Sequence, residues 1–239
     1  MAFSLEGHTA RAFDGELSAL HIQAVAMGAL VIEQVQLAVN AYSNWDRATA
    51  TLVLDRERRI NSYDSEIEEA ALQVIAKRQP VAQDLRAVFA IDKVVTELER
   101  AADEAKKLAL TVLADSETNG FKPGAATVRE ARSLGRLAVV MIRAALEAFD
   151  RLDPVAAANV IQQDQEMDSE YAVALRRILT HAMEDPRRLQ AAIEAAFIMR
   201  SLERIGDHAR NIARHIGFVA GEVDPNATGV LPASFSIKS

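Results

Sequence analysis

The 239 residues carry a formal net charge of −7, contain no Cys, and are half apolar. The missing Cys excludes a disulfide framework and thiolate chemistry. The acidic balance argues against nucleic-acid binding, which depends on Lys and Arg contacts to phosphate. Gly, Pro and aromatic residues are scarce, a composition typical of a helical protein.

Apolar residues recur at intervals of three and four through most of the chain, which predicts six long amphipathic helices. In the first half, one helix is expected over residues 17–43, a second ends at about residue 78, and a third follows Pro80 and ends at about residue 115. In the second half, the expected helices span residues 126–151, 154–184 and 186–221. The joints inside each half are short, and short joints make consecutive helices antiparallel neighbours. We therefore expect an all-α fold of two tandem three-helix bundles.

A stretch rich in Asn, Gly and Pro at 116–124 interrupts the pattern and predicts a linker. The expected domains are residues 9–115 and 125–221, and residues 222–239 are expected to form a disordered tail. The amino terminus lacks the features of a signal peptide, and we expect no segment of transmembrane length. These observations predict a soluble cytoplasmic protein.

One motif occurs twice, in residues 98–109 and 202–213, and both copies read Leu-Glu-Arg-x-x-Asp-x-Ala. Polar pairs four residues apart also correspond between 57–61 and 164–168. A repeat of this length is a strong architectural signal. It predicts that the two bundles are related by a pseudo-twofold axis.

Each copy of the motif places Glu and Asp four residues apart, so both acids lie on one face of the helix. Like charges at this spacing destabilise a helix unless something positive lies near them. Carboxylates from neighbouring helices are hard oxygen ligands that suit Mg, Mn, Ca or Fe. The candidate metal ligands are Glu99 and Asp103 with Glu57 and Asn61, and Glu203 and Asp207 with Asp164 and Asp168.

Ion pairing is the competing interpretation of the same acids, because Arg100, Arg200 and Arg204 lie close to them in the sequence. Asn61 makes the first site the weaker metal candidate, since it replaces an acid. His208 is a candidate extra ligand. Gly206, inside a helix, predicts a close approach of a neighbouring helix. No Glu-x-x-His pair, Gly-rich phosphate loop or hydrolase arrangement is present.

With the duplicated motif in place, the chain resembles the PhoU family of phosphate-uptake regulators from about His8 to Gly221. The resemblance also rests on three further segments, 75–80 with 84–86, 183–186, and the Glu-Arg-Ile-Gly-Asp of 203–207. It implies six helices in two three-helix bundles and acidic motifs that bind metal in some members. The expected cofactors are therefore Fe, Zn, Mn or Mg ions at the acidic helix faces.

The resemblance implies a regulator rather than an enzyme. Members of the family restrain the phosphate-starvation response between an ABC phosphate transporter and a sensor histidine kinase. The transporter's ATPase and the kinase are the implied partners, at the inner face of the membrane, and a homodimer is expected. Two alternatives stay open: a metal-dependent phosphate-handling enzyme with a carboxylate cluster, and a helical adaptor whose acids are only ion-paired.

Overall fold

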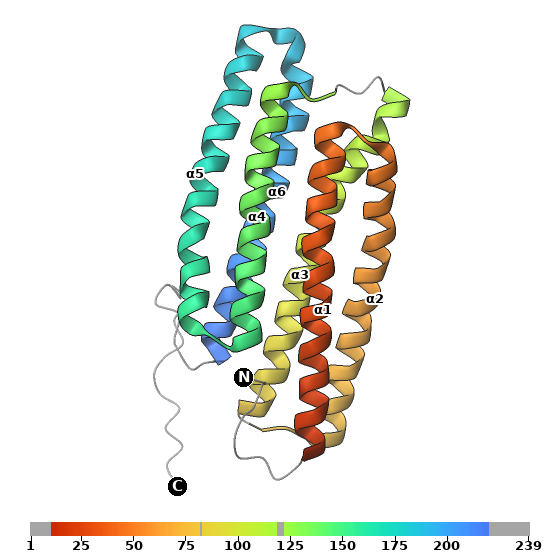
Figure 1. Cartoon of the computed structure of the whole chain (residues 1–239), viewed down its shortest axis with the longest axis vertical. Coiled ribbons are helices and arrows are strands. Elements are labelled where there is room, and N and C mark those ends of the chain that lie inside the picture. Colours follow the sequence, from red (N-terminus) through yellow and green to blue (C-terminus); the bar gives the residue numbers. More distant parts are fainter. Residues whose placement is uncertain (1–10, 82, 119–121, 220–239) are drawn as a thin grey trace.

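The computed structural model describes residues 11–81, 83–118 and 122–219, and every regular element in these ranges is a helix. Figure 1 shows the helices running roughly along the long axis of the molecule. Their bounds are α1 Arg11–Asn44, α2 Arg47–Arg78, α3 Gln83–Thr118, α4 Ala125–Arg151, α5 Pro154–Glu184, the short 3₁₀ helix η1 Pro186–Arg188, and α6 Leu189–Val219. The prediction of six long helices is confirmed.

The structure differs from the predicted helix bounds in three places. The first helix begins at Arg11, and α3 continues to Thr118, into the expected linker. The sixth helix is preceded by a 3₁₀ turn, because the backbone N–H of Arg188 donates to the carbonyl of Asp185 three residues earlier, at 2.9 Å, before regular α-helix starts at Leu189. The expected tail 222–239 lies outside the described residues, as do residues 1–10.

The same joint connects the first and second helices of each half. Trp45 and Leu152 both adopt the left-handed conformation, with φ of 55° and 48°, which ends α1 and α4. The next residue in each case, Asp46 or Asp153, caps the following helix by accepting from backbone N–H groups two residues on, at 3.0 and 2.9 Å. The joints therefore reverse the chain in the same way in both halves.

Within each half, all three helices contact one another, and the halves meet through α1 against α4 and α3 against α6. Figure 1 shows the two bundles side by side, with α1 and α4 adjacent where the halves meet. Across α3 and α6, Nδ1 of His208 lies 2.8 Å from Oε2 of Glu97, and Nε of Arg204 lies 3.1 Å from Oε1 of Glu104. These pairs show that α3 and α6 run antiparallel, as expected when a pseudo-twofold axis lies perpendicular to the helices.

Glycines at equivalent positions bring α1 and α4 together. A Cβ added at Gly28 would lie 2.5 Å from both methyl groups of Leu146, and one added at Gly135 would lie 2.6 Å from Cγ2 of Val39. Each half thus supplies one glycine and one aliphatic side chain, and the two contacts are related by the repeat. This packing holds the halves closer than any larger residue would allow.

The expectation that no segment reaches transmembrane length is wrong for α1. Among the described helices, α1 alone is long and apolar enough to cross a membrane, with a mean hydropathy of 1.6 in its most apolar stretch. Its side chains Leu20, Met27 and Val31 are buried in the shared core. Contacts with α2, α3 and α4 therefore explain its apolar character.

Candidate functional site

The second acidic cluster lies between α5 and α6. Asp164 and Glu203 are buried, while Asp207 is half-buried and Asp168 is exposed. Burial raises the pKa of Glu203 to about 7, and repulsion from Asp207 and the other two carboxylates adds to this, against the influence of Arg200. The structure therefore brings together all four acids that the sequence assigned to this site.

Arg210 lies between two of these acids. Its Nη1 pairs with Oδ2 of Asp164, and its Nη2 lies 2.7 Å from Oδ1 of Asp207. Arg200 donates to Oε1 of Glu203 at 2.6 Å, whereas Oε2 of Glu203 is buried and has no hydrogen-bond partner among the described residues. The cluster is thus only partly neutralised by its own side chains.

The first acidic cluster has the same plan between α2 and α3. Lys106 Nζ lies 3.1 Å from Oδ1 of Asp103 and 3.5 Å from Oε1 of Glu57. Burial raises the pKa of Glu57, although a hydrogen bond from Gln34 and the charge of Lys106 oppose the shift. The pKa of Glu99 is also raised, first by burial and then by repulsion from Asp103. Lys106 and Arg210 hold equivalent positions, three residues after the Asp of each motif.

Sequence reasoning missed two features of these clusters. Asp64 belongs to the first, because its charge raises the pKa of Glu99, and its position seven residues after Glu57 could have signalled a shared helix face. The second missed feature is the pairing role of Lys106 and Arg210, although both stand in the repeated motif.

Asn61, which the sequence predicted as a candidate ligand, is exposed. The structure gives its side chain no contact with the cluster among the described residues.

Two of the expected ion pairs form with different partners. Arg204 pairs with Glu104 of the other half, and Arg100 pairs with Glu97 at 3.4 Å, so the structure gives neither an ion pair with the acid next to it in the sequence among the described residues. Only Arg200 pairs as expected. His208 was a candidate ligand beside Asp207, but its Nδ1 faces Glu97 across the contact between the halves.

The donor chemistry of both clusters suits a hard cation, because the side chains are crowded carboxylates and one buried oxygen of Glu203 is unpaired. In the part of the chain that the structure describes, however, no three His, Asp or Glu side chains are arranged to hold a metal ion. Arg210 and Lys106 lie where the acids converge. Metal binding at these residues stays a prediction, and a cation would have to displace the basic side chain.

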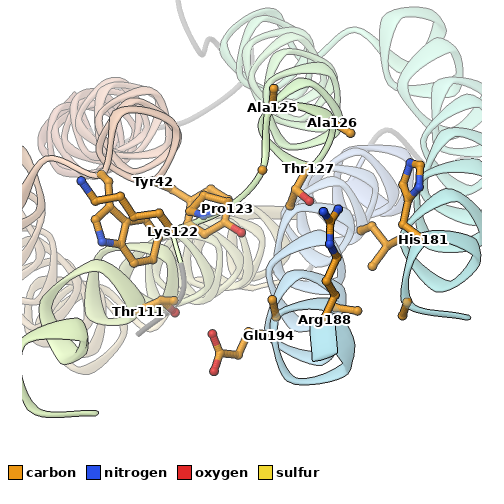
Figure 2. Close-up of a pocket in the computed structure, with 16 residues that line it drawn as sticks. Tyr42, Thr111, Lys122, Pro123, Ala125, Ala126, Thr127, His181, Arg188 and Glu194 are labelled. Carbon is orange, nitrogen blue, oxygen red and sulfur yellow. The ribbon is translucent and has the colours of Figure 1, made fainter. Parts of the chain in front are cut away.

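A separate cavity of about 410 Å³ opens near the start of α4, where the two halves meet. Figure 2 shows residues 125–127 of α4 on one side, Tyr42 and Lys122 on another, and Arg188, Glu194 and His181 opposite them. Burial raises the pKa of Tyr42, and the charge of Glu194 adds to this. Because the lining carries charges of both signs, the cavity defines no charge-selective site.

Glu203 makes the stability of the protein depend on pH. In chelating buffer, we expect Glu203→Gln to raise the free energy of unfolding by on the order of 2 kcal/mol at about pH 8 and to change it little at about pH 4. The unfolded chain releases this proton near pH 4.5, whereas the folded chain holds it up to about 7. The native state of the unmodified protein therefore loses stability as the pH rises between these values.

Urea unfolding of both proteins across this pH range measures the difference. The exposed Glu166 of α5 offers a matched control, and Glu166→Gln should leave the pH dependence unchanged. A Glu203→Gln protein that loses as much stability as the unmodified protein over this range would contradict the role of Glu203.

Fold and site together define an all-α protein of two repeated three-helix bundles, each with an ion-paired carboxylate cluster between its second and third helices. The PhoU domain model matches residues 25–112 and 131–216. The chain belongs to the PhoU family.

Known relatives agree with this assignment over nearly the whole chain. The chain is 38% identical to the phosphate-specific transport system accessory protein PhoU homolog of Pseudomonas aeruginosa, over 95% of this chain and 93% of that protein. It is 35% identical to the accessory protein PhoU of Escherichia coli, over 90% of this chain and 88% of that protein.

Solved structures agree with the same assignment. The crystal structure of PhoU from Pseudomonas aeruginosa superposes with a TM-score of 0.82 at 39% identity, covering 88% of this chain and 100% of that one. PhoU from Streptococcus pneumoniae gives 0.78 at 28% identity, covering 89% and 99%.

Proposed function

We propose that this protein is a non-enzymatic regulator in a phosphate-specific transport system. It moderates phosphate import and keeps the phosphate-starvation response off when phosphate is plentiful. The observation that carries this proposal is the match of nearly the whole chain to proteins named as accessory proteins of phosphate-specific transport. Their names describe accessory proteins and not enzymes, which favours the regulator over the alternative of a metal-dependent phosphate-handling enzyme.

The proposed partners are the ATPase of an ABC phosphate transporter and the sensor histidine kinase of the phosphate two-component system. The protein would act in the cytoplasm, recruited through these partners to the inner face of the membrane, and as a homodimer. The two bundles pack against each other through α1–α4 and α3–α6, which suits such a role because surfaces of both halves would be available to two partners.

The proposal includes Fe, Zn, Mn or Mg ions at the acidic faces. In the second half, Asp164, Asp168, Glu203 and Asp207 would hold the ion; in the first half, the ligands would be Glu57, Glu99 and Asp103, with Asn61 only if its exposed side chain turns inward. A bound cation would neutralise the repulsion that raises the pKa of Glu203 and would fix the third helix of each half against the second. It would thereby shape the surface that partners meet.

Alkaline phosphatase activity of the source cells in phosphate-rich medium tests the regulatory role. We expect high activity in cells that lack the gene and low activity when the intact gene is restored. Unchanged activity in the deletion strain would contradict the proposed negative regulation, while the fold and the family would stand. A phosphatase assay of the purified protein with Mn²⁺ addresses the enzyme alternative separately, and turnover there would contradict the non-enzymatic assignment.

A further inference from the structure

Three large apolar side chains lie exposed on one face of α6. Leu189, Ile193 and Phe197 are 54%, 49% and 69% exposed. Their spacing of four residues places them in a row on the same face of the helix, opposite the buried row that includes Leu202 and Ile205. We call Leu189, Ile193 and Phe197 the α6 patch.

The repeat shows that the fold does not need Phe197. This residue precedes Leu202 of the motif by five positions, as Lys93 precedes Leu98 in the first half. Lys93 is a solvated charge with a side chain 55% exposed, so the equivalent helix of the first half, α3, folds with Lys at this position. An exposed aromatic residue with no packing role is typical of a binding surface, where aromatic side chains supply much of the affinity.

Arginines bound the α6 patch at both ends. Arg187 and Arg188 of η1 precede it in the sequence, Arg188 beside the cavity at the start of α4, and Arg200 and Arg204 follow it on the same face of α6. Arg188, Arg200 and Arg204 each pair with an acid of this chain, yet their side chains stay 64%, 52% and 48% exposed. The patch thus presents an apolar centre and a positively charged rim on a protein of net charge −7.

We propose that the α6 patch docks an amphipathic helix of another protein, one with an apolar row flanked by acidic residues. The distance along α6 from Leu189, which follows Arg188, to Arg204 is about 22 Å, which corresponds to a partner helix of about 16 residues. Apolar contacts would supply the affinity, and the arginines would select the acidic ends. This proposal does not depend on the identity of the partners named above.

Two other occupants fit less well. A twofold contact between copies places the same patch on both sides, so the arginines at its ends would face arginines. An anionic membrane attracts basic side chains locally, but the net charge of −7 repels the protein as a whole. An acidic helix from a different protein avoids both penalties.

Photo-crosslinking in the source cells tests the proposal. Ile193→p-benzoylphenylalanine in the full chain should crosslink a segment of another protein, and mass spectrometry of the adduct should map it to an apolar helix with acidic ends. The same replacement at the exposed Arg176 of α5 is the control and should give no such adduct. Crosslinks to a second copy or to lipid, or none above the control, would overturn the proposal.

The mapped segment, made as a synthetic peptide, should then bind the purified chain. Phe197→Lys should weaken this binding at least about tenfold, whereas Phe89→Lys, at the position in α3 that corresponds to Ile193, should not change it. The Phe197→Lys protein should unfold at the same temperature as the unmodified protein, because Lys93 occupies the equivalent position of α3. The Phe89→Lys protein should do the same, because the side chain of Phe89 is half exposed. Equal binding by the Phe197→Lys protein would also overturn the proposal.

Discussion

Replacing Arg210 with Met should lower the free energy of unfolding by about 3 kcal/mol in a chelating buffer at about pH 8. Arg210 pairs with Asp164 and Asp207, and its side chain is only 22% exposed. Met keeps the apolar stem but removes the charge, so the buried carboxylate of Asp164 and the half-buried carboxylate of Asp207 would lose the cation that pairs with both of them. Removal of one partner of a buried pair costs more than the pair contributes, because an uncompensated charge stays behind.

The same variant measures whether the cluster accepts a cation. If Mn²⁺ or Mg²⁺ can occupy the place that Arg210 leaves, either ion should restore most of the lost stability, and the unmodified protein should respond less. Combining Arg210→Met with Glu203→Ala and Asp207→Ala should remove this response. Thermal unfolding with and without each ion gives both results.

Lys106→Met provides the comparison in the first half. Its effect should be smaller, because Asp103 and Lys106 are 48% and 33% exposed, and water screens their interaction more strongly. Arg176→Met, at an exposed position on α5, should change nothing. An Arg210→Met protein that responds to the ions no more than the unmodified protein would contradict the metal assignment of the second cluster.

The helices and the short joints between them could be predicted from the sequence because their determinants are local. Helix starts follow from caps such as Asp46 and Asp153, and helix faces follow from apolar spacing such as Ile60, Ile67 and Val74, all of which are buried. The repeated motif also predicted the relation between the halves. The prediction that a neighbouring helix approaches closely at Gly206 is confirmed, since a Cβ added there would lie 3.0 Å from Cγ of Met167 in α5.

The candidate site could be predicted only in part, because periodicity gives the face of a residue but not its partner. Arg204 stands beside Glu203 in the sequence, yet it reaches Glu104 in the other half. Arg210, seven residues after Glu203, lies on the right face and closes the cluster. The choice between these two arginines depends on how α3 packs against α6, and this long-range contact has no signature within either helix.

The glycines between the halves are another case in which the sequence does not reveal the contact partner, because Gly28 and Leu146 are far apart in the chain. Gly28→Val should lower the free energy of unfolding by about 3 kcal/mol, because its side chain would occupy the space of Leu146. Gly15, in the same helix, has nothing within 4 Å of an added Cβ. Gly15→Val should therefore change stability little, and urea unfolding of the three proteins gives the comparison.

A second substitution separates steric overlap from the other effects of losing a glycine. Gly28→Val combined with Leu146→Ala keeps the volume of the contact nearly constant, so it should recover most of the stability lost by Gly28→Val alone. The equivalent contact predicts the same for Gly135→Val combined with Val39→Ala, since Val39 faces Gly135 as Leu146 faces Gly28. If the double variants are no more stable than the single ones, overlap between α1 and α4 is not the cause. If both recover, steric overlap at two equivalent glycine contacts limits how closely α1 and α4 can approach.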